Sequence, residues 1–367
     1  MSFKPEEIFL GIMSGTSCDG LDLALIGFEE AETKMRYRFL GEEMVAYDAA
    51  MHKRLLSCTT LSANELALLE HEWTVFAADS VNAFLSQYDI KPHCIGFHGH
   101  TVFHRPELGY TVQMGSGATL ASRCGIDVVC NFRQQDVALH GQGAPLVPVG
   151  DRDLFPEYDA FLNLGGFANA TLRDNQKGIE TIRAFDICAA NIVLNRYAAL
   201  LGKPFDESGA EARKGIIDAV LLDWLNQITE SNNESRLNSL GVEWLEETIL
   251  PCLEQYRTKQ LHEGHPEAQS ISTILATYTE HIAIQCGKQL KGTVLVSGGG
   301  THNTYLLERI EQNSQAKLEK ADKKLIDFKE ALIFAYLAYC RIHLKENTLI
   351  SVTGAEKPSI SGALYKA

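Results

Sequence analysis

Four segments of the chain repeat one pattern, in which a short apolar run is followed by glycines and small polar residues. They are residues 8–28, 160–172, 182–194 and 293–310. In the first segment the pattern predicts a strand over Ile8–Met13, a turn over Ser14–Gly20 and a second strand over Leu21–Phe28. Apolar runs of about six residues bounded by glycine are typical of buried strands.

The second half of the chain begins in the same way. Phe161–Leu164 predicts a strand, Gly165-Gly166 a turn and Phe167–Leu172 the returning strand. Glycine after a buried strand lets the backbone turn sharply or approach a ligand closely. Because a glycine hairpin opens each half, the pattern suggests a duplicated lobe with a ligand cleft between the copies.

Longer segments with helical spacing lie between these hairpins. Ser62–Leu85 predicts a helix that Ser62 caps, with Glu65 completing a capping box. Ser272–Leu290 and Phe328–Leu344 predict two more helices. Alternation of strands and helices indicates an α/β protein with sheet cores.

The Met13–Gly20 turn is a candidate phosphate-binding loop. The chain has no GxxxxGK[ST] loop after a strand and no GxGxxG loop that opens a helix. The turn offers hydroxyls, amides and glycines instead, and the carboxylates of Asp19 and Asp22 suit a hydrated Mg²⁺. Asp-Gly is also the commonest hairpin turn signal, so a plain polar turn is an equal alternative.

A second glycine loop, Ser297–Gly300, follows the apolar run Val294–Val296 and precedes a predicted helix. A glycine run that leads into a helix N-terminus can hold an anion or a nucleotide. The alternative is a simple helix N-cap at Thr301 or Asn303. Two such loops, one in each half, favour a shared nucleotide.

Asp186 ends an apolar strand and begins a predicted loop of small residues, Asp186–Ala190. A carboxylate at a strand end is a candidate general base. Its equal alternative is the N-cap of a helix over Asn191–Leu201. Arg133 similarly follows a strand-like run and is either a ligand contact or a surface arginine paired with Asp136.

Three histidines, His98, His100 and His104, lie in the segment FHGHTVFHRP. Their spacing matches no HExxH or zinc-finger pattern, so metal binding is not expected. We expect hydrogen bonds to a polyhydroxylated ligand instead, with Arg105 available for an anion.

Composition limits the class of protein. The 367 residues, 45% of them hydrophobic, suffice for two domains or two tightly joined lobes. A net charge of −14 argues against a general nucleic-acid binder.

The nine scattered cysteines fit reduced thiols. The N-terminus has no apolar signal core, and no apolar run reaches the roughly 18 residues of a membrane helix. We therefore expect a cytoplasmic protein without membrane or nucleic-acid partners.

Ordered motifs over nearly the whole chain resemble the anhydro-N-acetylmuramic acid kinases. These motifs are GIMSGTSCDGLD, HGHTVFHRP, FRQQDVALHGQGAPLVP, NLGGFANATL, GKPFDESG, SGGGTHN, DFKEALIFAYLA and VTGA. The resemblance implies an α/β, two-lobed actin/hexokinase-like (ribonuclease H-like) fold of duplicated domains with an interlobe cleft. It also implies an ATP- and Mg²⁺-dependent kinase of peptidoglycan recycling. Such a kinase opens 1,6-anhydro-N-acetylmuramic acid with water and phosphorylates O6, and it is typically a homodimer.

The resemblance also implies roles for individual residues. Asp186 matches the catalytic aspartate, while Thr101, Arg133, Asn191 and Glu330 match the substrate pocket. The nucleotide would contact Gly15, Thr16, Ser17, Cys18, Asp19, Gly20, Leu21, Asp22, Gly298, Gly299 and Gly300.

Residues 1–133 with 345–367 are expected to form the N-terminal lobe, and residues 134–344 the C-terminal lobe. The chain departs from the family pattern after Asp186, where it reads DICAAN rather than DTGPGN. Two alternatives stay open, a kinase of 1,6-anhydroglucose (levoglucosan) and a non-catalytic actin-like nucleotide-binding protein.

Overall fold

The computed structural model describes residues 6–15, 18–31, 34–176, 179–233, 240 and 242–367. The chain divides into two compact units, which are Met1–Pro156 with Asp327–Ala367 (unit 1) and Glu157–Ile326 (unit 2). The divisions therefore fall at 156/157 and 326/327, whereas the sequence predicts them at 133/134 and 344/345. The difference arises because residues 134–156 and 327–344 pack within unit 1. The Phe155 ring, for example, lies 5.4 Å from the Tyr37 ring, and the Tyr336 ring lies 5.6 Å from the Phe28 ring.

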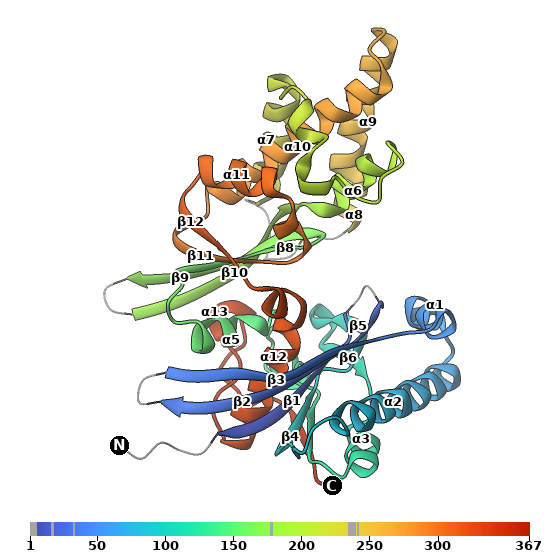
Figure 1. Cartoon of the computed structure of the whole chain (residues 1–367), viewed down its shortest axis with the longest axis vertical. Helices are drawn as coiled ribbons and strands as arrows, with labels where there is room; N and C mark the ends of the chain where they lie inside the picture. Colours follow the sequence, from blue (N-terminus) through green and yellow to red (C-terminus); the bar gives the residue numbers. More distant parts are fainter. Residues whose placement is uncertain (1–5, 16–17, 32–33, 177–178, 234–239, 241) are drawn as a thin grey trace. The chain divides into compact units, whose positions relative to one another are not determined.

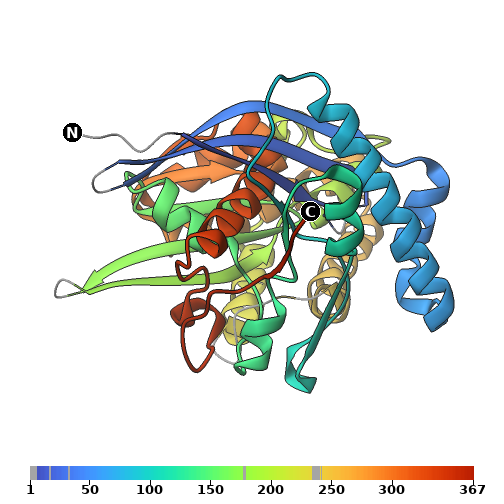
Figure 2. The same ribbon diagram turned by 90° about the horizontal axis from the view of Figure 1, so that it is seen from below.

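Unit 1 is built around a six-stranded sheet. Its strands and helices are β1 Glu7–Met13, β2 Gly20–Ala31, β3 Lys34–Ala46, α1 Ala49–Leu56, α2 Ala63–Leu85, β4 Cys94–Phe97, β5 His100–Arg105, β6 Tyr110–Met114, α3 Gly117–Cys124, β7 Val128–Cys130, α4 Gln134–Ala138, α5 Val147–Leu154, α12 Lys323–Ile342, α13 Ile350–Thr353 and β13 Ala363–Tyr365. The strand order is β13-β7-β4-β1-β2-β3, and β5 with β6 forms a separate hairpin. β2 is antiparallel to β1 and to β3, whereas β4 and β7 run parallel to β1. β13 pairs antiparallel with β7, and Figure 2 shows the last part of the chain, in red, leading to the C-terminus.

Alternate residues of β1 face opposite sides of the sheet, as strand geometry requires. Leu10 and Ile12 belong to the core that α2 and α3 complete. On the other side, the Phe9 ring lies 5.5 Å from the Tyr339 ring of α12. Gly11 allows the closest approach, because a Cβ there would lie 1.8 Å from the carbonyl oxygen of Ala331. Helix α12 therefore packs directly on the sheet backbone (Figure 1).

Unit 2 contains a five-stranded sheet. Its elements are β8 Ala160–Leu164, β9 Phe167–Gln176, β10 Ile179–Ala189, α6 Asn191–Ala199, α7 Ala219–Asn233, α8 Val242–Trp244, a π-helical turn Leu245–Ile249, α9 Leu250–His262, α10 Glu267–Gly287, β11 Lys291–Ser297, α11 Thr304–Gln312 and β12 Gln315–Lys320. The order is β10-β9-β8-β11-β12, with an antiparallel meander over β8, β9 and β10 and with β11 parallel to both β8 and β12.

The two sheets share one topology. In each, the first three strands form an antiparallel meander, and the next two strands follow in parallel on the other side of the first strand. A helix precedes the fourth strand of each sheet, α2 in unit 1 and α10 in unit 2. This is the ribonuclease H-like arrangement of actin- and hexokinase-like proteins, so the predicted α/β fold with duplicated domains is confirmed.

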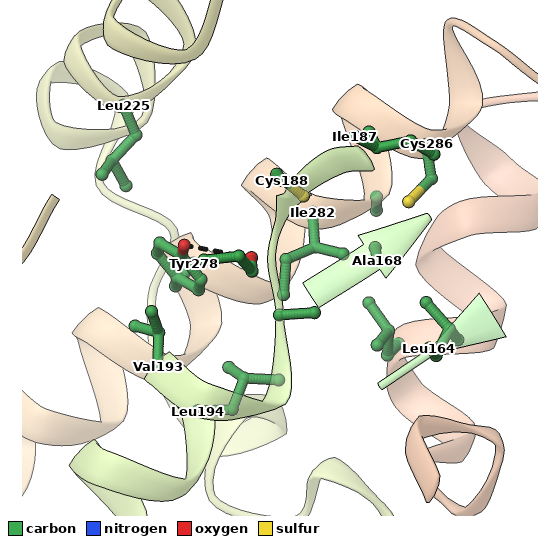
Figure 3. Packing of buried hydrophobic residues seen from close by; sticks show 14 of the residues in the cluster. Leu164, Ala168, Ile187, Cys188, Val193, Leu194, Leu225, Tyr278, Ile282 and Cys286 are labelled. Atoms are coloured by element: carbon green, nitrogen blue, oxygen red, sulfur yellow. Dashed lines mark hydrogen bonds between the residues drawn. The ribbon is translucent and has the colours of Figure 1, made fainter. Parts of the chain in front are cut away.

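The core of unit 2 lies between its sheet and its helices. Ile282 and Cys286 of α10 are fully buried in one cluster with Leu164 and Ala168 of the sheet (Figure 3). At its centre the hydroxyl of Tyr278 donates a 3.1 Å hydrogen bond to the carbonyl of Ala189, at the end of β10. This bond anchors the strand that carries Asp186.

Most predicted elements are confirmed, including the two glycine hairpins and the capping box. The Ser62 amide donates to Glu65 Oε2 at 2.9 Å, and the Glu65 amide donates back to the Ser62 hydroxyl. The predicted loop over Asp186–Ala190 is wrong, because β10 continues to Ala189 with a bulge after Asp186. Within the described ranges no helix is both long and apolar enough to cross a membrane.

Candidate functional site

The predicted phosphate loop connects β1 with β2, and Ser14 begins it as a buried residue. The Ser14 hydroxyl accepts a 2.9 Å hydrogen bond from Tyr47 and lies 3.1 Å from Nδ1 of His100. Trp73 in turn donates to the Tyr47 hydroxyl at 3.0 Å. Tyr47 and His100 thereby fix the start of the loop, and Trp73 in turn holds Tyr47.

Cys18 fixes the other side of the same loop. It adopts a left-handed conformation with a φ of 56°. Its carbonyl lies 2.8 Å from Nδ1 of His52, and its thiol lies 3.9 Å from Nε2 of His100. His100 therefore contacts both ends of the loop, Ser14 and Cys18, while Thr16 and Ser17 lie outside the described residues.

The predicted nucleotide contacts at the end of the loop differ in what they can offer. The Leu21 side chain is fully buried in the core of unit 1. Only its backbone is thus available to a ligand. Gly20 lies against β3, where a Cβ would meet the Met44 sulfur at 2.5 Å. Asp22 is paired with Met13 across the hairpin and remains partly exposed.

Carboxylates gather around Asp22. Partial burial raises the pKa of Asp22 to about 6, and the neighbouring charges of Glu330, Asp327 and Asp19 contribute to this rise in that order. Such a concentration of carboxylates is the environment that hydrated Mg²⁺ prefers. The described residues nevertheless hold no group of three His, Cys, Asp or Glu side chains that could bind a metal directly. The donor set therefore suits a cation that keeps most of its water.

Arg133 is not the surface residue of its alternative interpretation. Its Nε and Nη2 donate to Nε2 of His98 at 3.1 and 3.0 Å, and its Nη1 donates to the Gly143 carbonyl at 2.8 Å. Asp136, its expected partner, accepts instead from the Gly143 amide and the Thr353 hydroxyl, both at 2.7 Å. Burial lowers the pKa of Arg133 to about 10, and the charge of Glu330 opposes this shift.

Ligand binding by the histidines stays a prediction, and contacts within the protein already engage two of the three. His98 and His100 are both buried, and both ring nitrogens of each contact protein groups. Nδ1 of His104 lies 3.0 Å from the Thr111 hydroxyl. The predicted free cation, Arg105, forms an ion pair with Glu107.

Thr101, a predicted substrate residue, lies at a bulge in the β5–β6 hairpin. Its side chain is partly exposed, and its hydroxyl accepts a long, 3.4 Å hydrogen bond from Gln113. The β5 strand also carries His100, so Thr101 follows directly after the residue that holds the phosphate loop.

In unit 2, Asp186 lies in β10 opposite Asn169 of β9, immediately before the bulge at Ile187. Its Oδ2 accepts a 2.8 Å hydrogen bond from the backbone N–H of Leu240. The N-cap alternative for Asp186 is wrong, because α6 begins at Asn191 after Ala190 and has no side-chain cap. A bulge of this kind bends the strand locally and changes the direction of the neighbouring side chains.

The two glycine loops of unit 2 lie next to each other around Leu164. Asn191 donates from its side chain to the Leu164 carbonyl at 2.9 Å. Gly298 has a φ of 84°, and a Cβ on Gly300 would lie 2.6 Å from Cβ of Leu164. At Gly299, by contrast, a Cβ would have no atom within 4 Å, so this glycine borders open space.

The alternative N-cap at Asn303 is also present. The Asn303 side chain accepts from the Leu306 amide at 3.0 Å and so caps α11. A short 3-10 turn, Gly299–His302, separates this cap from β11. The glycine run therefore forms its own turn before the helix, and its exposed glycine stays available to a ligand.

The predicted residues are thus divided between the two units. Unit 1 carries the candidate phosphate loop, the carboxylates, Thr101, Arg133 and Glu330, while unit 2 carries Asp186, Asn191 and the glycines at 298–300. Sequence reasoning missed the structural roles of His98 and Leu240. Their partners lie 35 and 54 positions away in the chain, and no local pattern marks them.

Comparison with known proteins is consistent across the chain. A sequence model of the anhydro-N-acetylmuramic acid kinase family matches residues 7–367. The anhydro-N-acetylmuramic acid kinase of Pseudomonas syringae pv. syringae is 30% identical over 99% of this chain and 100% of its own. The Bordetella petrii kinase is 34% identical over 99% of this chain and 97% of its own length. The Sulfurimonas denitrificans kinase is 32% identical over 98% of this chain and 100% of its own length.

Solved structures give weaker similarities. Component A of the (R)-2-hydroxyglutaryl-CoA dehydratase of Acidaminococcus fermentans has a TM-score of 0.42 and 13% identity over 90% of this chain and 96% of its own. Hexokinase from Schistosoma mansoni has a TM-score of 0.37 and 11% identity, covering 91% of this chain and 85% of its own. The fold assignment rests on the strand orders instead. From the match over residues 7–367 and the full-length relatives, the chain belongs to the anhydro-N-acetylmuramic acid kinase family.

Proposed function

We propose that this chain opens 1,6-anhydro-N-acetylmuramic acid with water and phosphorylates its O6, giving N-acetylmuramic acid 6-phosphate during cell wall recycling. Family membership over residues 7–367 makes the chain a kinase that uses ATP. The observation that carries the more detailed proposal is Asp186, a carboxylate held by a backbone amide beside a strand bulge. A kinase that only phosphorylates a free hydroxyl has no need of water activation, whereas opening an anhydro bridge does.

In this reaction Asp186 acts as the general base. Its carboxylate takes a proton from water as the water oxygen bonds to the anomeric carbon, C1. The C1–O6 bond breaks, and O6 forms a bond to the γ-phosphorus of ATP as ADP leaves. The proton ends on Asp186 and then passes to solvent. A well-placed base of this kind typically contributes on the order of 10²–10⁴-fold in rate.

Each unit offers one glycine loop as a candidate contact for ATP. On unit 1 His100 holds Ser14 and Cys18 of the loop. On unit 2 the open space at Gly299 admits a flat or charged group close to the backbone. When bound, Mg²⁺ would neutralise phosphate charge, and Asp19 and Asp22 would hold it through water.

The sugar would contact the remaining residues. Arg133 offers a fixed cation, Glu330 an exposed carboxylate and Thr101 a partly exposed hydroxyl. The Asn191 side chain is partly exposed but already donates to Leu164, so it offers its amide oxygen.

The proposal is tested by incubating the purified protein with ATP, Mg²⁺ and each of two sugars, 1,6-anhydro-N-acetylmuramic acid and 1,6-anhydroglucose. We expect mass spectrometry to find a product heavier than the first sugar by one water and one phosphoryl group. A phosphorylated sugar that retains its anhydro bridge would contradict the hydrolytic step. ADP release without any sugar phosphate would contradict the kinase assignment to either sugar.

The setting of the reaction is a further part of the proposal. All nine cysteines are free, and eight of them are buried. Nine thiols without a disulfide support a reducing compartment such as the cytoplasm. The homodimer stays a prediction, which light scattering of the purified protein tests.

A further inference from the structure

Arg133 is a cation held by neutral acceptors. Its contacts within the described part of the chain go to a ring nitrogen of His98 and to the carbonyl of Gly143. Neither acceptor carries a negative charge. Glu330 acts on Arg133 through its charge, and the described contacts include no hydrogen bond between the two. A guanidinium arranged in this way is suited to receive an anion from outside.

His98 determines how the guanidinium lies. Nδ1 of His98 is 2.7 Å from the carbonyl oxygen of Gly99, which can only accept, so Nδ1 carries the ring proton. Nε2 therefore has its lone pair available for Arg133. Burial and the charge of Arg133 keep the pKa of His98 well below its usual value, so the ring is neutral at physiological pH. The Phe334 ring, centred 4.5 Å from that of His98, restricts the imidazole further.

The number of donors then points to the ligand. A guanidinium has five N–H groups. The contacts with His98 and Gly143 use three of them, one each on Nε, Nη1 and Nη2. One N–H on each terminal nitrogen is left over, and a carboxylate is a charge-assisted acceptor for such donors.

We propose that His98 is a positioning residue that presents Arg133 to the carboxylate of the sugar substrate. In muramic acid this carboxylate belongs to the lactyl ether, which the corresponding glucosamine sugar lacks. The pair thereby sets a preference for a carboxylated anhydrosugar over a neutral one. The inference rests on the proposed function, because it assigns one part of that substrate to one part of the site.

Two variants of His98 separate positioning from simple structural support. His98→Asn places an amide near the position of Nδ1 and can keep the contact with Gly99, but it is too short to reach Arg133. His98→Gln extends to the position of Nε2 and can keep an acceptor for Arg133. Both replace the ring with a polar amide, so each is the other's control for the loss of the ring.

The test measures KM and kcat for 1,6-anhydro-N-acetylmuramic acid and for 1,6-anhydro-N-acetylglucosamine. We expect His98→Asn to raise KM for the carboxylated sugar about 10- to 100-fold, the usual range for losing a hydrogen bond to a charged group. KM for the neutral sugar and for ATP should stay within about twofold. His98→Gln should recover most of the lost affinity.

Equal increases of KM for both sugars, or equal effects of the two variants, would overturn the inference. If neither variant folds, Arg133→Lys keeps the charge but removes the guanidinium donors, and it should lose the same preference. A wild-type protein that phosphorylates neither sugar contradicts the proposed function itself. A wild-type protein that phosphorylates both equally well contradicts only the role of the pair.

Discussion

The backbone N–H of Leu240 donates a 2.8 Å hydrogen bond to Oδ2 of Asp186. Leu240 is itself buried, with 7% of its surface exposed, so its packing holds the donor in place. The contact therefore orients the proposed base.

Asp186→Asn removes the base while keeping the shape of the side chain. Its amide oxygen can still accept from Leu240, so the fold should be unaffected. We expect kcat to fall on the order of 10²–10⁴-fold, with ATP affinity unchanged. Steady-state kinetics and calorimetric titration with a non-hydrolysable ATP analogue measure the two quantities. A loss smaller than tenfold would indicate that another residue is the base.

Leu240→Pro removes the amide hydrogen that Asp186 accepts. The carboxylate loses the donor that orients it, so kcat should fall roughly tenfold or more while KM for ATP stays unchanged. Steady-state kinetics with the sugar and with ATP as the variable substrates measure the two quantities.

Leu240→Ala is the matched control, because it removes packing and keeps the amide. Its kcat should stay close to that of the wild type, even if its melting temperature falls. A fall in kcat of the same size in both variants would show that Leu240 acts through packing and that the amide has no special effect.

Asp22→Asn should stabilise the protein at alkaline pH and not at acid pH. The folded pKa of about 6 lies above the unfolded value of about 3.9, so the folded state binds the proton more tightly. Ionised Asp22 therefore lowers the free energy of unfolding. The whole effect is present above about pH 6, and none of it is present below about pH 4. After a discount for solvent exposure, the gain at about pH 8 is on the order of 1–2 kcal/mol.

Thermal unfolding at about pH 8 and at about pH 4 measures this difference. Mg²⁺ with ADP should raise the melting temperature of the wild type more than that of Asp22→Asn, because the variant offers the cation less charge. An equal gain in stability at both pH values would show that repulsion between carboxylates is not the cause.

Gly299→Ala tests the glycine loop of unit 2. A Cβ at Gly299 meets no atom within 4 Å, so the melting temperature should hardly change. If ATP lies there, KM for ATP should rise roughly tenfold or more, since the methyl group would occupy its space. Gly300→Ala is the contrast, because its Cβ would meet Leu164 at 2.6 Å and should lower the melting temperature. An unchanged KM for ATP in Gly299→Ala would exclude this loop from the nucleotide site.

Ser14→Ala interrupts the hydrogen bonds from Trp73 through Tyr47 to His100. Tyr47 and His100 are both buried, so each loses its partner at a cost of roughly 1–3 kcal/mol. We expect a lower melting temperature and a raised KM for ATP, with KM for the sugar unchanged.

Ser57→Ala is the control for Ser14→Ala, because the Ser57 hydroxyl is exposed and bonds only to carbonyls of the preceding helix. Its effect on stability should stay within about 0.5 kcal/mol. Parallel behaviour of the two variants would mean that the buried hydrogen bonds do not stabilise the loop.

The sequence predicted the elements whose signals are local. The hairpin at Gly165-Gly166 and the capping box of Ser62 and Glu65 are each specified within a few residues, and both are confirmed. The end of β10 was missed because Cys188 and Ala189 are small and resemble loop residues. They extend the strand since β9 pairs with them and α10 covers them.

Contacts between distant residues were beyond local patterns. His98 and Arg133 are each polar residues next to a strand, and each was interpreted separately as a ligand contact. Only the fold shows that they bind one another. The amide of Leu240 could not be anticipated at all, because every residue except proline has the same donor.

The common topology of the two sheets has a consequence for how such a protein could have arisen. The turn from β1 to β2 and the turn from β8 to β9 occupy equivalent positions, but only the first is long and acidic. In the second, the carbonyls of Gly165 and Gly166 accept from the amides of residues 190–192 and so start helix α6. After a gene duplication, one copy of the hairpin could bind a ligand because the other had taken a structural role at the start of α6. A change in the first hairpin would then affect the nucleotide site, whereas a change in the second would affect the fold.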